Sequence, residues 1–175
     1  MNKAELNQLL DNKFNELISW LEDQPEQNFA VQKVPNKWSN GEHLEHLRKT
    51  TRAINKGMRI PKLVLRYKFG KMNRKERTYE EIKTKYLGKL ASSKVKAPSM
   101  YSPKDISNAD RDRLISWFSQ ERDAMKAAVN KHTEKALGKY VIPHPLIGKL
   151  SFREFVYFTA YHTEHHFNLM KRYNS

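Results

Sequence analysis

Residues 151–170 read SFREFVYFTAYHTEHHFNLM, a stretch that predicts a long helix with one apolar face. At about 100° per residue, its apolar side chains recur every three or four positions and fall on one side of the helix. The residues that share this face are Phe152, Phe155, Val156, Phe158, Thr159, Leu169 and Met170. Ser151 and Glu154 precede it with the spacing of a capping box. We therefore expect a helix over residues 152–172.

The same spacing of apolar residues recurs in three earlier windows, each of which predicts a further helix. They cover residues 3–23, 40–59 and 108–131. A second capping box, Ser39 with Glu42, marks the start of the second window. At 175 residues the chain has the length of one domain that buries its own core. The sequence therefore predicts an all-α single domain over residues 1–175, built as an up-down, antiparallel four-helix bundle.

The connections between these helices have less regular patterns. The stretch Lys62–Phe69 fits either a short strand or a helical turn, while residues 77–90 favour a helix. Two prolines mark residues 97–103 as a loop, and Pro and Gly residues mark 133–150 as a second one. No strand pattern of appreciable length appears, which again favours an all-α fold.

Positive charge is concentrated between the second and third predicted helices. The chain holds 33 Lys and Arg against 19 Asp and Glu, a net charge of +14. Residues 56–96 alone contain 14 Lys and Arg and only three acids. We interpret this stretch as a long, solvated insertion on the surface of the bundle, because it lacks a recognisable nucleic-acid-binding motif. Binding of nucleic acid or of another anionic partner is the alternative interpretation.

The composition excludes several classes of protein. Cysteine is absent, which excludes disulfides, cysteine zinc sites, iron–sulfur clusters and a cysteine nucleophile. No stretch of 18 apolar residues occurs, so we expect no membrane-spanning segment and no membrane partner. The first residues form an amphipathic pattern without the apolar region of a signal peptide. We therefore expect a cytoplasmic protein.

Two histidines on the apolar face of the last predicted helix are the strongest functional signal. His162 and His166 are four residues apart, so their rings are neighbours on the helix surface and can bind one cation together. A hydrogen-bonded core role is the alternative, but both nitrogens of each ring would then need partners in an apolar layer. A third ligand would come from the second predicted helix, where His43 lies at the edge of the apolar stripe and His46 lies further round. The spacing leans to His43 without deciding between the two.

Two segments resemble the sequence motifs of a known family. Residues 38–47, WSNGEHLEHL, look like the W-S-x-x-E-x-L-x-H-L motif of the DinB-like superfamily, which includes the YfiT-type metal-dependent hydrolases. Residues 144–155, HPLIGKLSFREF, are similar to the family's H-P-x-x-G-x-L-S-x-x-E-[WF] motif, and the H-x-x-x-H pair of His162 and His166 follows. Both segments occur in the family's order, while the basic middle of the chain matches no part of the family pattern.

The resemblance implies a four-helix bundle that holds a divalent metal ion through three histidines. It assigns the ligands to His46, His162 and His166, and it leaves His43 and His165 as supporting or surface residues. Zinc or nickel is the expected metal, with iron or manganese as alternatives, because imidazole suits several of these ions. Three protein ligands leave coordination positions open for water or substrate, as in catalytic metal sites.

The expected activity is that of a metal-dependent enzyme, a hydrolase or a thiol S-transferase, acting on a small-molecule substrate. Because the chain has no cysteine, any low-molecular-weight thiol would come from outside. No general base is evident, and Glu121, on the inward face of the 108–131 helix, is the best carboxylate to support a ligand. The alternative is a non-enzymatic, stress-related or anionic-partner-binding protein that acts through the basic insertion. A homodimer is among the assemblies that we expect.

Overall fold

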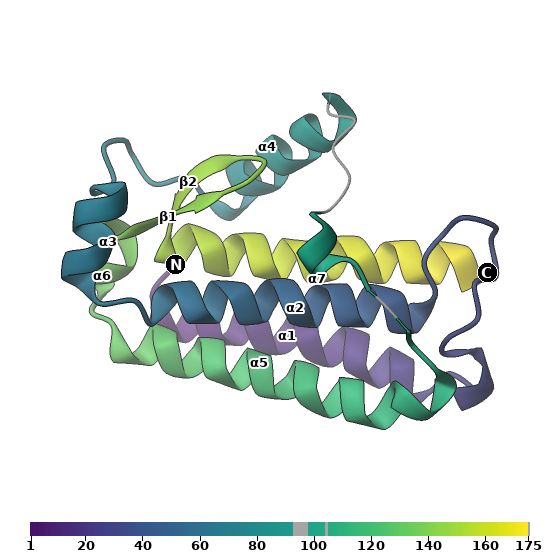
Figure 1. Cartoon of the computed structure of the whole chain (residues 1–175). Helices are drawn as coiled ribbons and strands as arrows, with labels where there is room; N and C mark the ends of the chain where they lie inside the picture. The colour runs from purple at the N-terminus through teal and green to yellow at the C-terminus, as the bar shows by residue number, and fades with distance from the viewer. Residues whose placement is uncertain (93–97, 104, 175) are drawn as a thin grey trace.

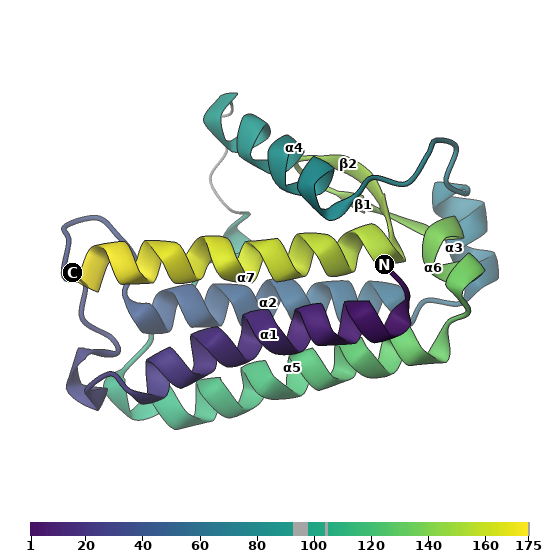
Figure 2. The same cartoon turned by 180° about the vertical axis from the view of Figure 1, so that it is seen from behind.

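A computed structural model describes residues 1–92, 98–103 and 105–174 of the chain. The described part is mostly helical, which confirms the predicted helical class. Four long helices lie side by side (Figures 1 and 2). They are α1 (Lys3–Glu22), α2 (Asn40–Met58), α5 (Arg111–Lys131) and α7 (Phe152–Asn174). Each begins and ends within three residues of its predicted bounds.

Shorter elements connect the long helices. The helical ones are α3 (Lys62–Phe69), α4 (Tyr79–Ser92), α6 (Glu134–Lys139) and the turns η1 (Glu26–Asn28), η2 (Ser99–Tyr101) and η3 (Asn108–Asp110). Two strands, β1 (Val141–His144) and β2 (Gly148–Ser151), form a hairpin. Figure 1 shows α3 and α6 at one end of the long helices, and α4 with the hairpin over α7. The stretch Lys62–Phe69, which the sequence fitted to either a short strand or a helical turn, is therefore helical.

The directions of the long helices differ from a simple up-down order. Each of α1 and α2 packs against both α5 and α7. Figures 1 and 2 show α2 and α5 running in the same direction, with α1 and α7 running in the opposite one. The up-down prediction is wrong in this respect. The connection between Met58 and Arg111 is long enough for the chain to return along the long helices before α5 begins, so consecutive long helices need not alternate in direction.

Apolar side chains from all four long helices meet in one core. Those at most 2% exposed include Leu6, Leu10, Phe14, Leu44, Leu47, Leu114, Phe118, Phe152 and Val156. The rings of Phe14 and Phe118 stack with their centroids 4.3 Å apart, which holds α1 close to α5. Burying one such side chain contributes about 1.5–3 kcal/mol, so packing of the apolar stripes stabilises the helices. No described helix is long and apolar enough to span a membrane.

Both predicted capping boxes are present and fix where α2 and α7 begin. The Glu42 amide donates to the Ser39 hydroxyl at 3.2 Å, and the Glu42 carboxylate accepts from the Ser39 amide at 2.7 Å. Ser151 and Glu154 make the same pair of bonds, at 3.1 and 3.0 Å. Because the helix start sets which residues face inward, these caps also set the positions of the histidines that follow.

The predicted loop over residues 133–150 is wrong, because most of it forms regular structure. It holds α6 and the hairpin, in which Val141 pairs with Ser151 and His144 with Gly148. Strands of four residues are too short to show a clear alternation, and Pro143 inside β1 favours a loop in the sequence. Gly148 has a φ of 82°, a backbone conformation that glycine adopts without strain.

The basic segment lies on the surface but is folded against the long helices. Every Lys and Arg described between residues 56 and 92 is exposed or half-buried, while residues 93–96 lie outside the described part. Arg74 contacts the fully buried Glu154 at N–O distances of 2.6 and 2.8 Å. The amide of Arg77 donates to the same carboxylate at 2.7 Å. The described segment is therefore anchored at the start of α7 rather than being a solvated loop.

Replacing Glu154 by Gln should destabilise the protein and loosen the basic segment. Burial alone would raise the pKa of Glu154, but hydrogen bonds from Arg74, Arg77 and Ser151 hold it below its usual value. The variant leaves Arg74 without its buried partner, so we expect a loss of about 3 kcal/mol in urea unfolding. Limited proteolysis should then cut the chain between α3 and α4 faster than in the unaltered protein.

The matched control is Glu42→Gln, since Glu42 occupies the same position in its capping box. Its carboxylate contacts only the Gln32 side chain besides its own helix cap among the described residues. We expect a loss of about 1 kcal/mol or less. Equal losses in the two variants would show that the ion pair of Glu154 does not tie the segment to α7.

Candidate metal centre

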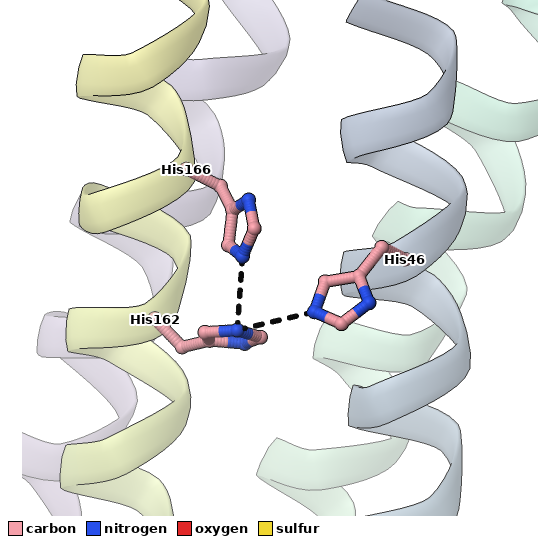
Figure 3. Close-up of side chains that lie close together, drawn as sticks. All are labelled: His46, His162 and His166. Atoms are coloured by element: carbon pink, nitrogen blue, oxygen red, sulfur yellow. Dashed lines mark hydrogen bonds between the residues drawn. The ribbon is translucent and has the colours of Figure 1, made fainter. Parts of the chain in front are cut away.

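Three buried histidines from two helices point toward one another (Figure 3). His46 comes from the first half of α2, and His162 and His166 lie one turn apart on α7. All three side chains are buried. The structure thus brings together the three residues that the family resemblance assigns as ligands.

The separations of the ring nitrogens fit a shared metal ion. Nε2 of His162 lies 3.3 Å from Nε2 of His46 and 3.0 Å from Nε2 of His166. One nitrogen from each ring lies within 4.8 Å of the other two. Nitrogens that share a zinc ion at about 2.0–2.1 Å stand roughly 3.0–3.4 Å apart. The cluster could therefore hold a divalent ion with α2 and α7 in their present positions, while its role as a ligand set stays a prediction.

The outer nitrogen of His46 is fixed by the backbone. Nδ1 of His46 lies 3.0 Å from the carbonyl oxygen of Tyr101, at the end of η2. A carbonyl only accepts, so Nδ1 carries the proton and Nε2 presents a lone pair to the cluster. Such an outer hydrogen bond is what orients a metal-binding imidazole. The tautomer of His46 is therefore the one that a metal ion requires.

His43 lies behind the cluster rather than in it. Its Nδ1 is 2.8 Å from Nδ1 of His166, and the side chain is 3% exposed. When His166 donates from Nδ1, its Nε2 is free to bind a metal, and His43 then carries its own proton on Nε2. That Nε2 is buried without a hydrogen-bond partner in the described part of the chain. The spacing in the sequence slightly favoured His43 as the third residue of the cluster. The structure instead brings His46 to the cluster and gives His43 a supporting contact to His166.

Burial keeps these imidazoles neutral. It lowers the pKa of His162 and His166 well below the ordinary value, and the neighbouring histidines lower it further. Burial also lowers the pKa of His46, although its hydrogen bond to Tyr101 opposes the effect. Burial, with a smaller contribution from His46, lowers the pKa of His43 to about 3. Neutral imidazole is the form that binds metal ions, so the cluster is prepared for a cation at neutral pH.

A cavity of about 320 Å³ opens beside the three rings. Its wall comes from α2, α4, α7, the hairpin and the segment around η2, and most of its side chains are aliphatic or aromatic. Tyr86, Leu90, Leu146 and Phe158 are among them. No Asp, Glu, Lys or Arg of the described residues lines the cavity. The cluster therefore lies at the side of an apolar cavity that a small molecule can enter.

His144 and His165 also line this cavity. Nδ1 of His144 accepts hydrogen bonds from the amides of Leu146 at 3.1 Å and Ile147 at 3.3 Å. The proton of a neutral His144 must then be on Nε2, which has no hydrogen-bond partner among the described residues. Burial lowers the pKa of His144 to about 4, which keeps the ring neutral. His144 therefore presents a neutral donor beside the cluster.

Glu121, the carboxylate that the sequence favoured as support for a ligand, is engaged elsewhere, and so is Glu164, which lies between His162 and His166 in the sequence. Glu121 accepts a hydrogen bond from Asn55 at 2.8 Å and forms an ion pair with Arg52, and none of the described hydrogen bonds joins it to a histidine. Glu164 pairs with Lys13 on α1 at 2.5 Å. The expectation that Glu121 supports a ligand thus finds no contact in the described residues. Glu121 lies against α2, where its carboxylate contacts Asn55 and Arg52 rather than His43 or His46.

Two contributors to the site were not assigned from the sequence. The Tyr101 contact uses a backbone carbonyl, which leaves no trace in the side-chain pattern. His144 stands in the quoted HPLIGKLSFREF segment, but its place beside the cluster depends on a hairpin that the sequence did not predict. A histidine flanked by two prolines at a sharp turn was the available signal.

The fold and the site together define a class of protein, namely helical proteins with a buried cluster of three histidines beside a small cavity. The model of the DinB superfamily matches residues 9–170, nearly the whole chain. The chain therefore belongs to the DinB superfamily. No match was found among curated proteins or among solved structures.

The metal-free protein should lose stability as the pH falls from 7.5 to about 5. Unfolded histidines titrate near pH 6.5, whereas burial keeps His43, His162 and His166 neutral in the folded chain at lower pH. The unfolded state therefore binds more protons below about pH 6.5. Each such histidine lowers the unfolding free energy by up to about 1.4 kcal/mol per pH unit, and this loss is absent above about pH 7. Urea unfolding of chelator-treated protein at several pH values measures it.

A His162→Leu variant provides the control for this pH dependence, since it removes one buried imidazole. Its unfolding free energy should depend less steeply on pH, by about one proton. A flat profile in the unaltered protein between pH 7.5 and 5 would show that the buried rings are protonated in the folded state.

Proposed function

We propose that the four long helices form a DinB-type four-helix bundle in which His46, His162 and His166 hold a divalent metal ion that serves thiol transfer to a small molecule. Zinc or nickel is the metal that we favour, because all three ligands are neutral imidazoles. The observation that carries the proposal is the convergence of three Nε2 atoms at the side of a cavity without charged side chains among the described residues. An external thiol and an electrophilic substrate would meet in this cavity.

The chemistry divides between the ion and the chain. When bound, such an ion lowers the pKa of a thiol or water molecule that it coordinates, so that the group reacts as its anion near neutral pH. The sulfur electron pair forms the new S–C bond, the leaving group departs with the pair of the broken bond, and the thiol proton passes to solvent. The Tyr101 carbonyl holds His46 in the required tautomer, and the apolar wall excludes water from the reacting atoms.

Hydrolysis is less well supported by the site. An attacking water molecule needs a group that accepts its proton, most often a carboxylate or a histidine. No described carboxylate lines the cavity. His144 already uses its Nδ1 lone pair to accept two amide hydrogen bonds, so it can donate a hydrogen bond but has no free lone pair. Among the described histidines outside the cluster, this leaves only His165 at the cavity to take the proton. A bound ion would lower the pKa of either nucleophile, but a thiol starts from a pKa of about 8.5 and water from about 15.7, so thiol transfer depends less on such a group.

A second candidate function is binding of an anionic partner through the basic segment. Eight Lys and Arg and no acid lie between residues 56 and 75. Many are on or beside α3, which Figure 1 shows at one end of the long helices. The positive charges are close enough to affect one another, since Arg66 and Lys139 lower the pKa of Lys71. Such a surface attracts polyanions, and nucleic acid is the simplest one to test.

Protein purified without a histidine tag should contain about one divalent ion per chain by elemental analysis. His46→Ala, His162→Ala and His166→Ala should each abolish stoichiometric metal, because each removes one of only three protein ligands. The loaded protein should accelerate the reaction of a small thiol with an alkyl halide, and chelator treatment should remove this activity. Faster hydrolysis of an ester without thiol consumption would favour the hydrolase instead.

Two further variants separate ligands from their neighbours. His165→Ala should keep most of the metal, because His165 makes no hydrogen bond to the cluster among the described residues. His43→Ala removes the contact to Nδ1 of His166, so we expect weaker metal binding by about 10–100-fold but metal retained at saturating concentration. If His162→Ala keeps stoichiometric metal, the proposed set of three ligands is wrong.

The second candidate function predicts binding to DNA or RNA that weakens as salt rises. Replacing Lys62, Arg66, Lys68 and Lys71 by Gln should reduce retention and flatten its salt dependence. The matched control replaces Lys126, Lys131, Lys135 and Lys171, which lie outside the segment, and should change it little. If the unaltered protein shows no retention at low salt, the nucleic-acid interpretation is wrong.

A further inference from the structure

The cavity beside the three histidines differs in chemistry from the rest of the protein. The chain carries 33 Lys and Arg and 19 Asp and Glu, yet none of those described lines the cavity. Aliphatic and aromatic side chains form most of the wall and come from four elements. Examples are Ile54 on α2, Leu90 on α4, Leu146 in the hairpin turn and Phe158 on α7. The described part of the wall therefore offers apolar contact and no ionic partner.

Three described cations on the helices that form the wall have partners of their own. The Lys49 ammonium donates to the Ser102 carbonyl at 2.9 Å and lies 3.6 Å from the Glu45 carboxylate. Lys83, on the helix that carries Tyr86, lies over the ring of Tyr161 at 5.4 Å. Arg48 forms a two-bond contact with Glu45, at 2.6 and 2.8 Å. A carboxylate on a ligand would find no free described cation in the cavity.

We propose that this cavity binds a neutral, largely apolar small molecule, such as an aryl or alkyl thiol, that carries a single metal-binding head group. The inference rests on the proposed metal site and names the class of ligand for it. The head group would lie at the Nε2 atoms of the cluster, and the apolar body would lie against Leu90, Leu146 and Phe158. A charged group on the body would lose its hydration without gaining an ionic partner from the described wall, which disfavours binding.

The neutral donor of His144 adds one polar preference. Its Nε2–H has no partner among the described residues, and its ring packs against Phe158 with the centroids 4.3 Å apart. An uncharged acceptor on the ligand, such as a carbonyl or ether oxygen, can take this hydrogen bond without bringing a charge into the cavity. A volume of about 320 Å³ is at the small end for ligand sites, which span about 300–1,000 Å³. A single ring or a short chain fits this limit.

The test compares two thiols that differ by one charge. The protein is loaded with Co²⁺, which takes the same imidazole ligands as zinc and gives a visible spectrum. Phenylmethanethiol and 4-(mercaptomethyl)benzoate are then titrated, and their binding is followed by the change in that spectrum. We expect the neutral thiol to bind at least ten-fold more tightly, and the methyl ester of the benzoate to recover most of the difference.

A pair of variants locates the preference in the cavity. Leu90→Lys places a cation in the wall and should improve binding of the benzoate relative to the neutral thiol by about ten-fold, with Co²⁺ binding unchanged. Leu87→Lys is the matched control on the same helix, since Leu87 is 39% exposed and does not line the cavity. It should leave the ratio of the two affinities as in the unaltered protein.

The outcomes separate this inference from the proposed function. If no Co²⁺ spectrum develops, the metal site itself is wrong and the inference fails with it. If the loaded protein binds the benzoate as tightly as the neutral thiol or more tightly, the metal site stands and the neutral-ligand inference is overturned. Equal responses of the Leu90→Lys and Leu87→Lys variants would also overturn it, because the ligand would then lie outside this cavity.

Discussion

The buried carboxylate of Glu154 joins the parts of the structure that the site requires. It caps the first turn of α7 through Ser151 and binds Arg74 and the amide of Arg77, which lead into α4. The neighbouring Arg153 binds Glu76 in the same connection at 2.7 Å. These contacts place α4 over α7, where its Tyr86 and Leu90 form part of the cavity wall. Two ion pairs, one of them to a fully buried carboxylate, therefore link the start of α7 to the helix that forms part of the cavity wall.

The cluster itself is an arrangement of neutral polar groups in an apolar layer, and such groups are costly to bury without partners. The structure satisfies most of them with one another: His46 bonds a backbone carbonyl, His166 bonds His43, and the inner nitrogens face each other. With Nε2 of His46 and of His166 both acting as acceptors, His162 has only one Nε2–H to share between them. A cation that accepts all three lone pairs resolves this conflict, which is a physical reason for the cluster beyond the family resemblance.

The sequence predicted the parts of the fold that depend on local spacing. The long helices, both capping boxes and the inward position of His162 and His166 follow from a 3.6-residue period and from residues next to each helix start. The choice between His43 and His46 did not follow from the spacing, which puts His43 at the edge of the apolar stripe and His46 further round. The rotation of α2 against α7 decides which ring meets His162 and His166. The resemblance, not the spacing, pointed to His46.

Other features depend on contacts between distant segments and could not be read locally. The shared direction of α2 and α5 follows from the path of a long connection. The hairpin strands are too short to show a clear alternation of apolar and polar residues. Glu121 lies on the inward stripe of α5, yet its hydrogen bond to Asn55 turns it to a different pocket from that of the histidines. The spacing in the sequence predicts which side chains face the neighbouring helices, but it does not predict which residues they meet along the length of those helices.

The return of the chain along α2 has a consequence for how the protein acquires its site during folding. His46 and His162 are separated by 116 positions, and the Tyr101 carbonyl that orients His46 is 55 positions away from it. Contacts between residues so far apart in sequence form slowly, because the intervening chain must first be ordered. During synthesis, α1, α2 and α5 all leave the ribosome before α7 supplies two of the three rings. Assembly of the histidine cluster is thus coupled to completion of the fold, and a partly made chain exposes His46 without its companions.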